Sequence, residues 1–170
     1  MAKQSVEMLF KAIPRQHVNL SKEDVYSLIQ YISAENRGQK KDPIQEFEES
    51  FAAYIGVPYA ISVSSARAAF SLIMEALDIR DGDEIILPAF NFSIFPKILM
   101  LKNIIPVFVD IDRDTLTIDC EKIRKKISLK TKAIVAVHLF GNPCGMEALI
   151  DLAKSYSLYV IEDCANAIGS

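Results

Sequence analysis

From residue 59 onward, short apolar runs alternate with stretches in which apolar residues recur every three or four positions. Runs such as residues 85–87 and 133–137 are apolar throughout, which is typical of strands that are covered on both faces. The stretches between them have the spacing of amphipathic helices. The predicted strands are residues 59–63, 84–87, 107–109, 133–137 and 158–161, and the predicted helices between them are residues 66–77, 92–101, 121–127 and 146–156.

Alternation of strands and helices predicts an α/β fold with a mostly parallel, doubly wound sheet. In such a sheet, ligands bind beyond the carboxyl ends of the strands. The segments that follow the predicted strands are therefore the places to look for a functional site. They are residues 64–67, 88–92, 110–112, 138–142 and 162–166.

The N-terminal part of the chain follows a different pattern. Residues 1–20 show no clear periodicity and are predicted to be an irregular segment, so the expected domain covers residues 21–170. Ser21 and Asp24 have the spacing of a capping box and should open a helix. Asp42 should cap a second helix, and Gly56 is a natural stop for it.

Composition and charge narrow the classes of partner. The net charge is −3 with both signs scattered along the chain, so no basic stripe suggests a nucleic acid. No apolar stretch reaches the roughly 20 residues needed to cross a bilayer, and the first residues make a poor signal peptide. Three widely spaced cysteines favour reduced thiols in the cytoplasm over a disulfide framework or a zinc site.

Asp163 is the strongest candidate for a chemical role, because Glu162 and Asp163 directly follow the last predicted strand. A carboxylate at such a place is desolvated and needs a partner. The partner could be the protonated ring nitrogen of a cofactor, or a lysine or arginine. An N-cap for the segment that follows is an equally good interpretation from position alone.

Other strand ends carry weaker candidates. Ser64 and Ser65 precede a predicted helix, where hydroxyls and backbone N–H groups can bind an anion, although simple capping explains them as well. Phe90 and Phe92 could stack on a flat cofactor or pack in the core. His138 is best interpreted as a histidine held by structural hydrogen bonds. The sequence contains neither a dinucleotide-binding glycine motif nor a P-loop. The turn-rich sequence around Asp110 and Asp112 favours a solvated loop.

Six blocks in order resemble the DegT/DnrJ/EryC1/StrS family of nucleotide-sugar aminotransferases. The family has the fold-type I, aspartate-aminotransferase-like architecture and uses pyridoxal 5′-phosphate (PLP). The resemblance covers about residues 12 to 170 and is more specific than any single motif. The blocks are FEESFAAYIG, SVSSARAAF, GDEIILPAFNF, IPVFVDID, TKAIVAVHLFG and YVIEDCANAIGS.

The resemblance implies roles for particular residues. Asp163 matches the aspartate that pairs with the pyridine nitrogen, and Phe92 matches the aromatic residue that stacks on the ring. Asn166 matches a position, usually glutamine, that contacts the ring hydroxyl. Ser65, Ala66 and Arg67 match the turn that holds the phosphate, which is usually Ser-Gly-Thr.

The resemblance also implies a reaction and its partners. A complete member transfers an amino group from an amino acid to a keto-sugar nucleotide in sugar or polysaccharide biosynthesis. Members are usually homodimers.

The family's Schiff-base lysine lies in a block beyond the ED-x-A-x-A-x-G segment, and no lysine of residues 1–170 matches it. We therefore expect this N-terminal portion to be inactive alone, without the C-terminal part of the large domain and the small domain. Two alternatives stay open. The chain could be a non-catalytic, truncated or split-gene product that pairs with a C-terminal half, or part of a PLP-dependent sugar dehydratase of the same fold.

Overall fold

The computed structural model describes residues 21–32 and 42–168, and the segment predicted to be irregular, residues 1–20, lies outside them. The chain divides into two units, residues 1–51 and 52–170. In the described part of the chain, no helix is long and apolar enough to span a bilayer.

The first unit contains the helix α2 (Lys22–Ile32), which begins as its sequence predicts. The Ser21 N–H donates to the Asp24 carboxylate at 2.8 Å. The Asp24 N–H donates back to the Ser21 hydroxyl at 3.0 Å. This reciprocal pair satisfies two donors that the first helical turn leaves without an intrahelical acceptor.

The helix α3 (Pro43–Ile55) also begins and ends at the predicted residues, and it extends past the boundary between the units. Asp42 caps it by accepting the Ile44 N–H at 3.0 Å. Beyond Ile55 the backbone turns away at Gly56, whose φ of 80° is costly for any residue with a Cβ atom.

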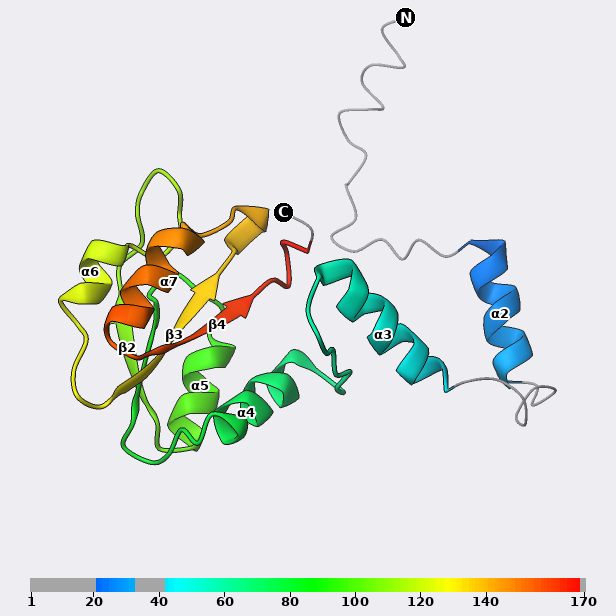
Figure 1. Cartoon of the computed structure of the whole chain (residues 1–170), viewed down its shortest axis with the longest axis horizontal. Coiled ribbons are helices and arrows are strands. Elements are labelled where there is room, and N and C mark those ends of the chain that lie inside the picture. Colours follow the sequence, from blue (N-terminus) through cyan, green and yellow to red (C-terminus); the bar gives the residue numbers. More distant parts are fainter. Residues whose placement is uncertain (1–20, 33–41, 169–170) are drawn as a thin grey trace, which may run out of the picture. The chain divides into compact units, whose positions relative to one another are not determined.

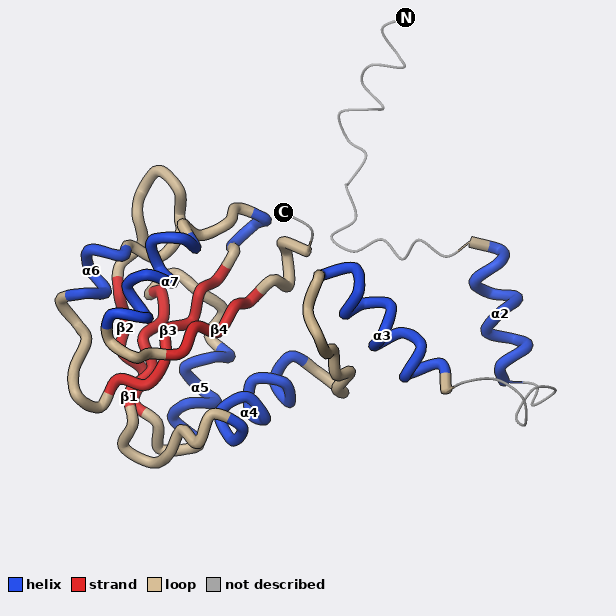
Figure 2. The backbone as a smooth tube through the Cα atoms, viewed as in Figure 1, coloured by secondary structure: helices blue, strands red, loops and turns tan. Residues whose placement is uncertain are grey.

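The second unit contains a four-stranded parallel sheet with the order β2-β1-β3-β4 (Figure 2). This confirms the predicted α/β fold with a parallel sheet. The strands are β1 (Glu84–Pro88), β2 (Ile105–Val109), β3 (Thr131–Val137) and β4 (Tyr159–Asp163).

Helices cover both faces of this sheet (Figure 1). The helices α4 and α5 pack on one face, and α6 and α7 pack on the other. Fully buried side chains fill both layers, for example Met74 and Leu99 on the first face and Ile123 and Leu149 on the second. The helical elements are α4 (Ala66–Ala76), α5 (Ile94–Leu101), α6 (Cys120–Arg124), the short 3-10 helix η1 (Leu139–Gly141) and α7 (Met146–Ser155).

The prediction of a first strand at residues 59–63 is wrong, since these residues have no regular secondary structure. A strand needs a neighbour for its backbone hydrogen bonds, and this segment pairs with neither edge of the described sheet. Tyr59 and Ile61 are 84% and 81% exposed. The apolar pattern is therefore present, but the segment is not a strand of the described sheet.

Candidate functional site

The order of the strands places the topological switch point of the sheet between β1 and β3. The chain passes from β1 to one edge of the sheet, and from β3 to the other edge. The loops that follow β1 and β3 therefore run in opposite directions. Doubly wound sheets bind ligands at such a point. Phe90 follows β1 and Phe140 follows β3, and their ring centroids lie 6.5 Å apart.

Asp163 is the last residue of β4, as expected for a strand-end carboxylate. Side chains alternate between the faces of a strand, and Ile161 packs in the layer of α4 and α5. Asp163 therefore points to this face. Its Oδ1 accepts the Ala165 N–H at 3.1 Å. This bond closes a turn, and no helix follows β4 in the described residues for Asp163 to cap. Within the described ranges, Oδ2 has no hydrogen-bond partner.

The first turn of α4 carries the residues that were predicted to form an anion site. Ser65 is the N-cap, and its hydroxyl accepts the Ala68 N–H at 3.2 Å. Capping is therefore real at this position. Ala66 begins the helix and does not have a positive φ. The N–H groups of Ala66 and Arg67 lie in the first turn, where an α-helix supplies no acceptor of its own.

Phe92 lies after β1 in the loop that leads to α5, and 55% of the residue is exposed. The preceding Asn91 has an unusual environment. Its Oδ1 accepts the Phe92 N–H at 2.6 Å. Its Nδ2 is buried and has no acceptor among the residues that the structure describes. A buried donor without an acceptor is costly, so this amide is suited to an acceptor from another molecule or segment.

Asn166 is exposed in the turn that follows β4. Among the described residues, no hydrogen bond or ion pair joins Asp163, Phe92 and Ser65 to one another. Asp163 ends β4, Asn166 follows it, and Phe92 follows β1. Ser65, Ala66 and Arg67 are at the start of α4.

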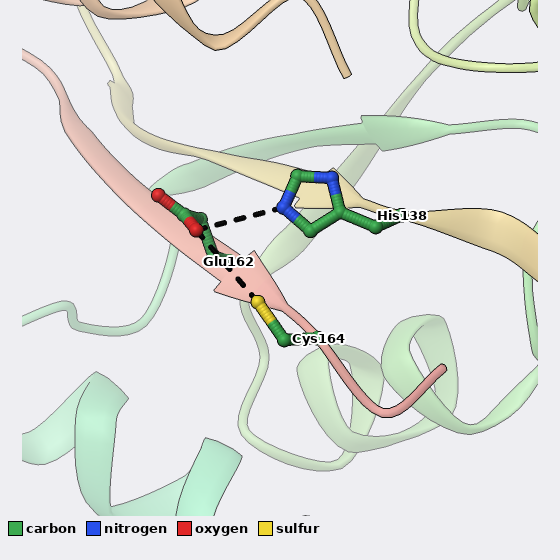
Figure 3. Close-up of side chains that lie close together, drawn as sticks. All are labelled: His138, Glu162 and Cys164. Carbon is green, nitrogen blue, oxygen red and sulfur yellow. Dashed lines mark hydrogen bonds and ion pairs between the residues drawn. The ribbon is translucent and has the colours of Figure 1, made fainter. Parts of the chain in front are cut away.

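A cluster that the sequence did not predict lies on the opposite face of the sheet. It contains His138, Glu162 and Cys164, whose side chains lie close together (Figure 3). His138 Nε2 is 3.5 Å from Glu162 Oε2, and the Cys164 thiol is 3.7 Å from the same oxygen. Residues 136, 138, 162 and 164 share this face because β3 and β4 pair with Ala136 opposite Glu162. The sequence does not show this register, so it could not predict the cluster.

The imidazole of His138 has a defined tautomer. The Cys144 N–H donates to His138 Nδ1 at 3.0 Å, so Nδ1 carries no proton and Nε2 carries one in the neutral ring. Histidines that bind metals use one nitrogen as a ligand and donate the N–H of the other. Here the second nitrogen is already an acceptor, so this tautomer is unsuited to a metal at Nε2. The expectation of a structurally bonded histidine is confirmed.

The thiols are poorly suited to nucleophilic chemistry. Burial raises the pKa of Cys144, and burial followed by the charge of Glu162 raises the pKa of Cys164. Burial also raises the pKa of Cys120. The thiolate is the reactive form, so these shifts agree with the view that the cysteines are core or surface thiols.

The segment after β2 is a solvated turn, as predicted. Asp112 Oδ1 accepts the Asp114 and Thr115 N–H groups, both at 2.9 Å. Beside β2 there is also a hollow of about 320 Å³, lined partly by Phe108, Asp110, Lys122, Lys125 and Lys126. Because β2 and β4 are at opposite edges of the sheet, this basic hollow is separate from Asp163.

Comparison with known proteins gives a consistent result. Residues 19–170 match the DegT/DnrJ/EryC1/StrS aminotransferase family. A GDP-perosamine synthase from Escherichia coli O157:H7 is 44% identical over 131 residues, which are 77% of this chain and 36% of that protein. The chain spans about a third of the length of the curated relatives that it matches.

Solved structures show the same architecture. An aminotransferase from Psychrobacter cryohalolentis superposes with a TM-score of 0.82 at 33% identity, over 89% of this chain and 38% of that one. A Streptococcus pneumoniae protein assigned as a sugar aminotransferase, in its PLP form, superposes with a TM-score of 0.82 at 25% identity. That match covers 92% of this chain and 44% of the other.

Proposed function

Because the chain belongs to the DegT/DnrJ/EryC1/StrS aminotransferase family, we propose that it is the N-terminal portion of a PLP-dependent aminotransferase. The whole protein would act on a keto-sugar nucleotide, with an amino acid as donor, in the synthesis of a polysaccharide or another amino-sugar product. The observation that carries the proposal is Asp163. It ends β4 on the α4/α5 face and keeps Oδ2 without a partner among the described residues.

The residues at these strand ends have the donors and acceptors that PLP requires. Asp163 Oδ2 is a carboxylate oxygen available to a protonated ring nitrogen, and the first turn of α4 offers N–H groups to a phosphate. Asn91 Nδ2 is a buried donor that still needs an acceptor. When bound, the cofactor would supply a ring that accepts electrons from the substrate.

Each residue would then contribute binding or orientation. Asp163 would keep the ring nitrogen protonated by pairing with it. Phe92, with its exposed ring, would stack on the pyridine. The hydroxyl of Ser65 and the N–H groups of Ala66 and Arg67 would bind the phosphate, and Asn166 would contact the ring hydroxyl.

Ala66 and Arg67 replace the usual glycine and threonine of the phosphate turn. Ala66 retains its N–H in a helical first turn, so its methyl group does not remove the donor. The guanidinium of Arg67 can form two parallel hydrogen bonds with a phosphate, in place of the single hydroxyl of a threonine. The substitution therefore exchanges a neutral donor for a charged one.

Binding of pyridoxamine phosphate tests the role of Asp163, because this form of the cofactor needs no covalent bond to a lysine. We expect the 170-residue chain to bind it, and Asp163→Asn to weaken binding about tenfold or more by removing a charge-assisted hydrogen bond. Asp110→Asn is the matched control, since Asp110 follows β2 at the other edge of the sheet. Equal affinities of the wild-type and Asp163→Asn chains in calorimetry, or no binding by the wild type, would contradict the proposal.

Covalent binding of PLP tests the second part of the proposal. Since no lysine of residues 1–170 matches the family's Schiff-base block, we expect this polypeptide alone to form no specific lysine adduct and to transfer no amino group. Borohydride reduction with PLP, followed by peptide mapping, would check this. A stoichiometric adduct on one lysine of the second unit would show that the assignment is wrong.

A further inference from the structure

The loop that follows β3 is attached to the segment that carries Asp163 and Asn166. The His138 N–H donates to the Asp163 carbonyl at 3.2 Å and so extends the pairing of β3 with β4 by one step. Three residues later, Gly141 approaches the turn after β4. A Cβ atom on Gly141 would lie 3.1 Å from the Asn166 carbonyl oxygen. The loop therefore touches both ends of residues 163–166.

The side chain of His138 fixes this attachment. The ring is buried, with 5% of the residue exposed. Its Nδ1 accepts the Cys144 N–H at the far end of the loop, and the Cys144 thiol donates to the Val137 carbonyl at 3.3 Å. Its Nε2 faces Glu162, the residue before Asp163. One imidazole thus joins the end of β3, the closed loop and the end of β4.

An anchor of this kind matters because of where β4 lies. Among the described strands, β4 is at the edge of the sheet and pairs only with β3. The end of an edge strand has backbone hydrogen bonds on one side only, so it opens at low cost. Asp163 is the last residue of this strand. The position of its carboxylate therefore depends on whether the end of β4 stays paired with β3.

We propose that His138 is a positioning residue that holds the Asp163 carboxylate for the pyridine nitrogen from the opposite face of the sheet, through Glu162 and the Asp163 backbone. This inference rests on the proposed function. Glu162 and His138 lie on the α6/α7 face, whereas Asp163 points to the α4/α5 face. His138 would therefore act without touching the cofactor.

His138→Asn is the most informative variant. The Asn Oδ1 can take the place of Nδ1 and accept the Cys144 N–H, while the donor to Glu162 is lost. We expect this variant to bind pyridoxamine phosphate about fivefold more weakly. Its affinity for the 1-deaza analogue, in which a C–H group replaces the pyridine nitrogen, should stay unchanged. Equal weakening of both ligands, or weakening of neither, would overturn the proposal.

A double-mutant cycle tests the same coupling. In the Asp163→Asn background the carboxylate is gone, so His138→Asn should cause no further loss of affinity for pyridoxamine phosphate. If His138→Asn does not fold, Glu162→Ala replaces it, since this side chain is 47% exposed and tolerates change. Glu162→Ala should weaken binding, and Glu162→Gln, which keeps an acceptor for Nε2–H, should restore it. Failure of this restoration would contradict the proposed contact.

Hydrogen exchange separates this inference from the proposed function. The Ala165 N–H is bonded to Asp163 Oδ1, so it reports on the carboxylate in the chain without any ligand. His138→Asn should speed exchange of this amide by about fivefold or more, with the amides of β1 unchanged. If the wild type binds no pyridoxamine phosphate, the proposed function fails and this measurement decides the inference alone. An unchanged Ala165 rate would overturn it.

Discussion

At the scale of single residues, Gly141 is the one described glycine that combines a positive φ with a close neighbour of its added Cβ atom. Its φ is 83°, a conformation that residues with a Cβ atom rarely adopt. The space is also restricted, because an added Cβ would approach the Asn166 carbonyl oxygen. Phe140, just before it, already has a φ of 56°. Two successive left-handed residues thus turn the loop back towards the end of β4.

Replacing Gly141 with alanine should therefore destabilise the fold. We expect Gly141→Ala to lower the free energy of unfolding by about 1–3 kcal/mol, through backbone strain and the close contact with Asn166. Gly145→Ala is the matched control, since Gly145 has a negative φ and nothing within 4 Å of its added Cβ. Urea denaturation of both variants checks this, and equal stabilities would contradict the stated geometry.

The reactivity of Cys164 gives a second prediction at this scale. Burial and then Glu162 raise the pKa of its thiol, so the protonated form should persist above the usual thiol range of about 8.5. Alkylation by iodoacetamide should keep rising beyond pH 9, and Glu162→Gln should accelerate it at pH 8. Rates measured for a chain with Cys120 and Cys144 replaced by serine test this. A plateau of the rate below pH 8 would refute it.

At the scale of elements, the sequence predicted strands that are apolar throughout and helices that begin at a local capping motif. The run at residues 133–137 lies within β3, and Ser21 with Asp24 opens α2 as a capping box. The segment 59–63 has an equally apolar pattern but depends on a partner strand, which a pattern cannot supply. The helix α6 is shorter than predicted and ends at Arg124, with Ile123 as its buried residue.

The candidate site follows the same division. Asp163 and Ser65 could be predicted, because the sequence pattern shows where strands end and where helices begin. The pair His138 and Glu162 could not, since it depends on the register of β3 against β4. The buried Asn91 amide was likewise hidden, because burial of one atom in a loop leaves no periodic signal.

The turn after β2 should respond to acid. Hydrogen bonds from the Thr115 and Asp114 N–H groups hold the pKa of Asp112 below its usual range. Since the folded pKa is lower than the unfolded one, this contribution is present above about pH 4. It is lost as the pH falls through the folded pKa. NMR titration should show a midpoint for Asp112 below that of an unfolded reference peptide, and an equal midpoint would contradict the assignment.

At the scale of the whole molecule, the second unit has large apolar residues that its own described residues leave exposed. Tyr59, Ile61 and Tyr159 are exposed, and β4 is an edge strand of the described sheet. Such edges and patches favour association. They also agree with a chain that spans about a third of the length of its relatives.

We therefore expect the 170-residue chain to self-associate as its concentration rises. Ile61→Lys should reduce this association, because it places a charge on an exposed apolar segment. Its effect on the free energy of unfolding should be within about 0.5 kcal/mol, as for most surface substitutions. Sedimentation velocity over a range of concentrations checks the prediction. A monomer at every concentration would contradict it, as would association that Ile61→Lys leaves unchanged.

The order β2-β1-β3-β4 also has a consequence for synthesis on the ribosome. β1 and β2 leave the exit tunnel first and can pair before the rest of the sheet exists. β3 then adds to the free side of β1, and β4 adds to β3. Every later strand meets an edge that has already formed, so the sheet can grow outward during translation without waiting for the C-terminal residues.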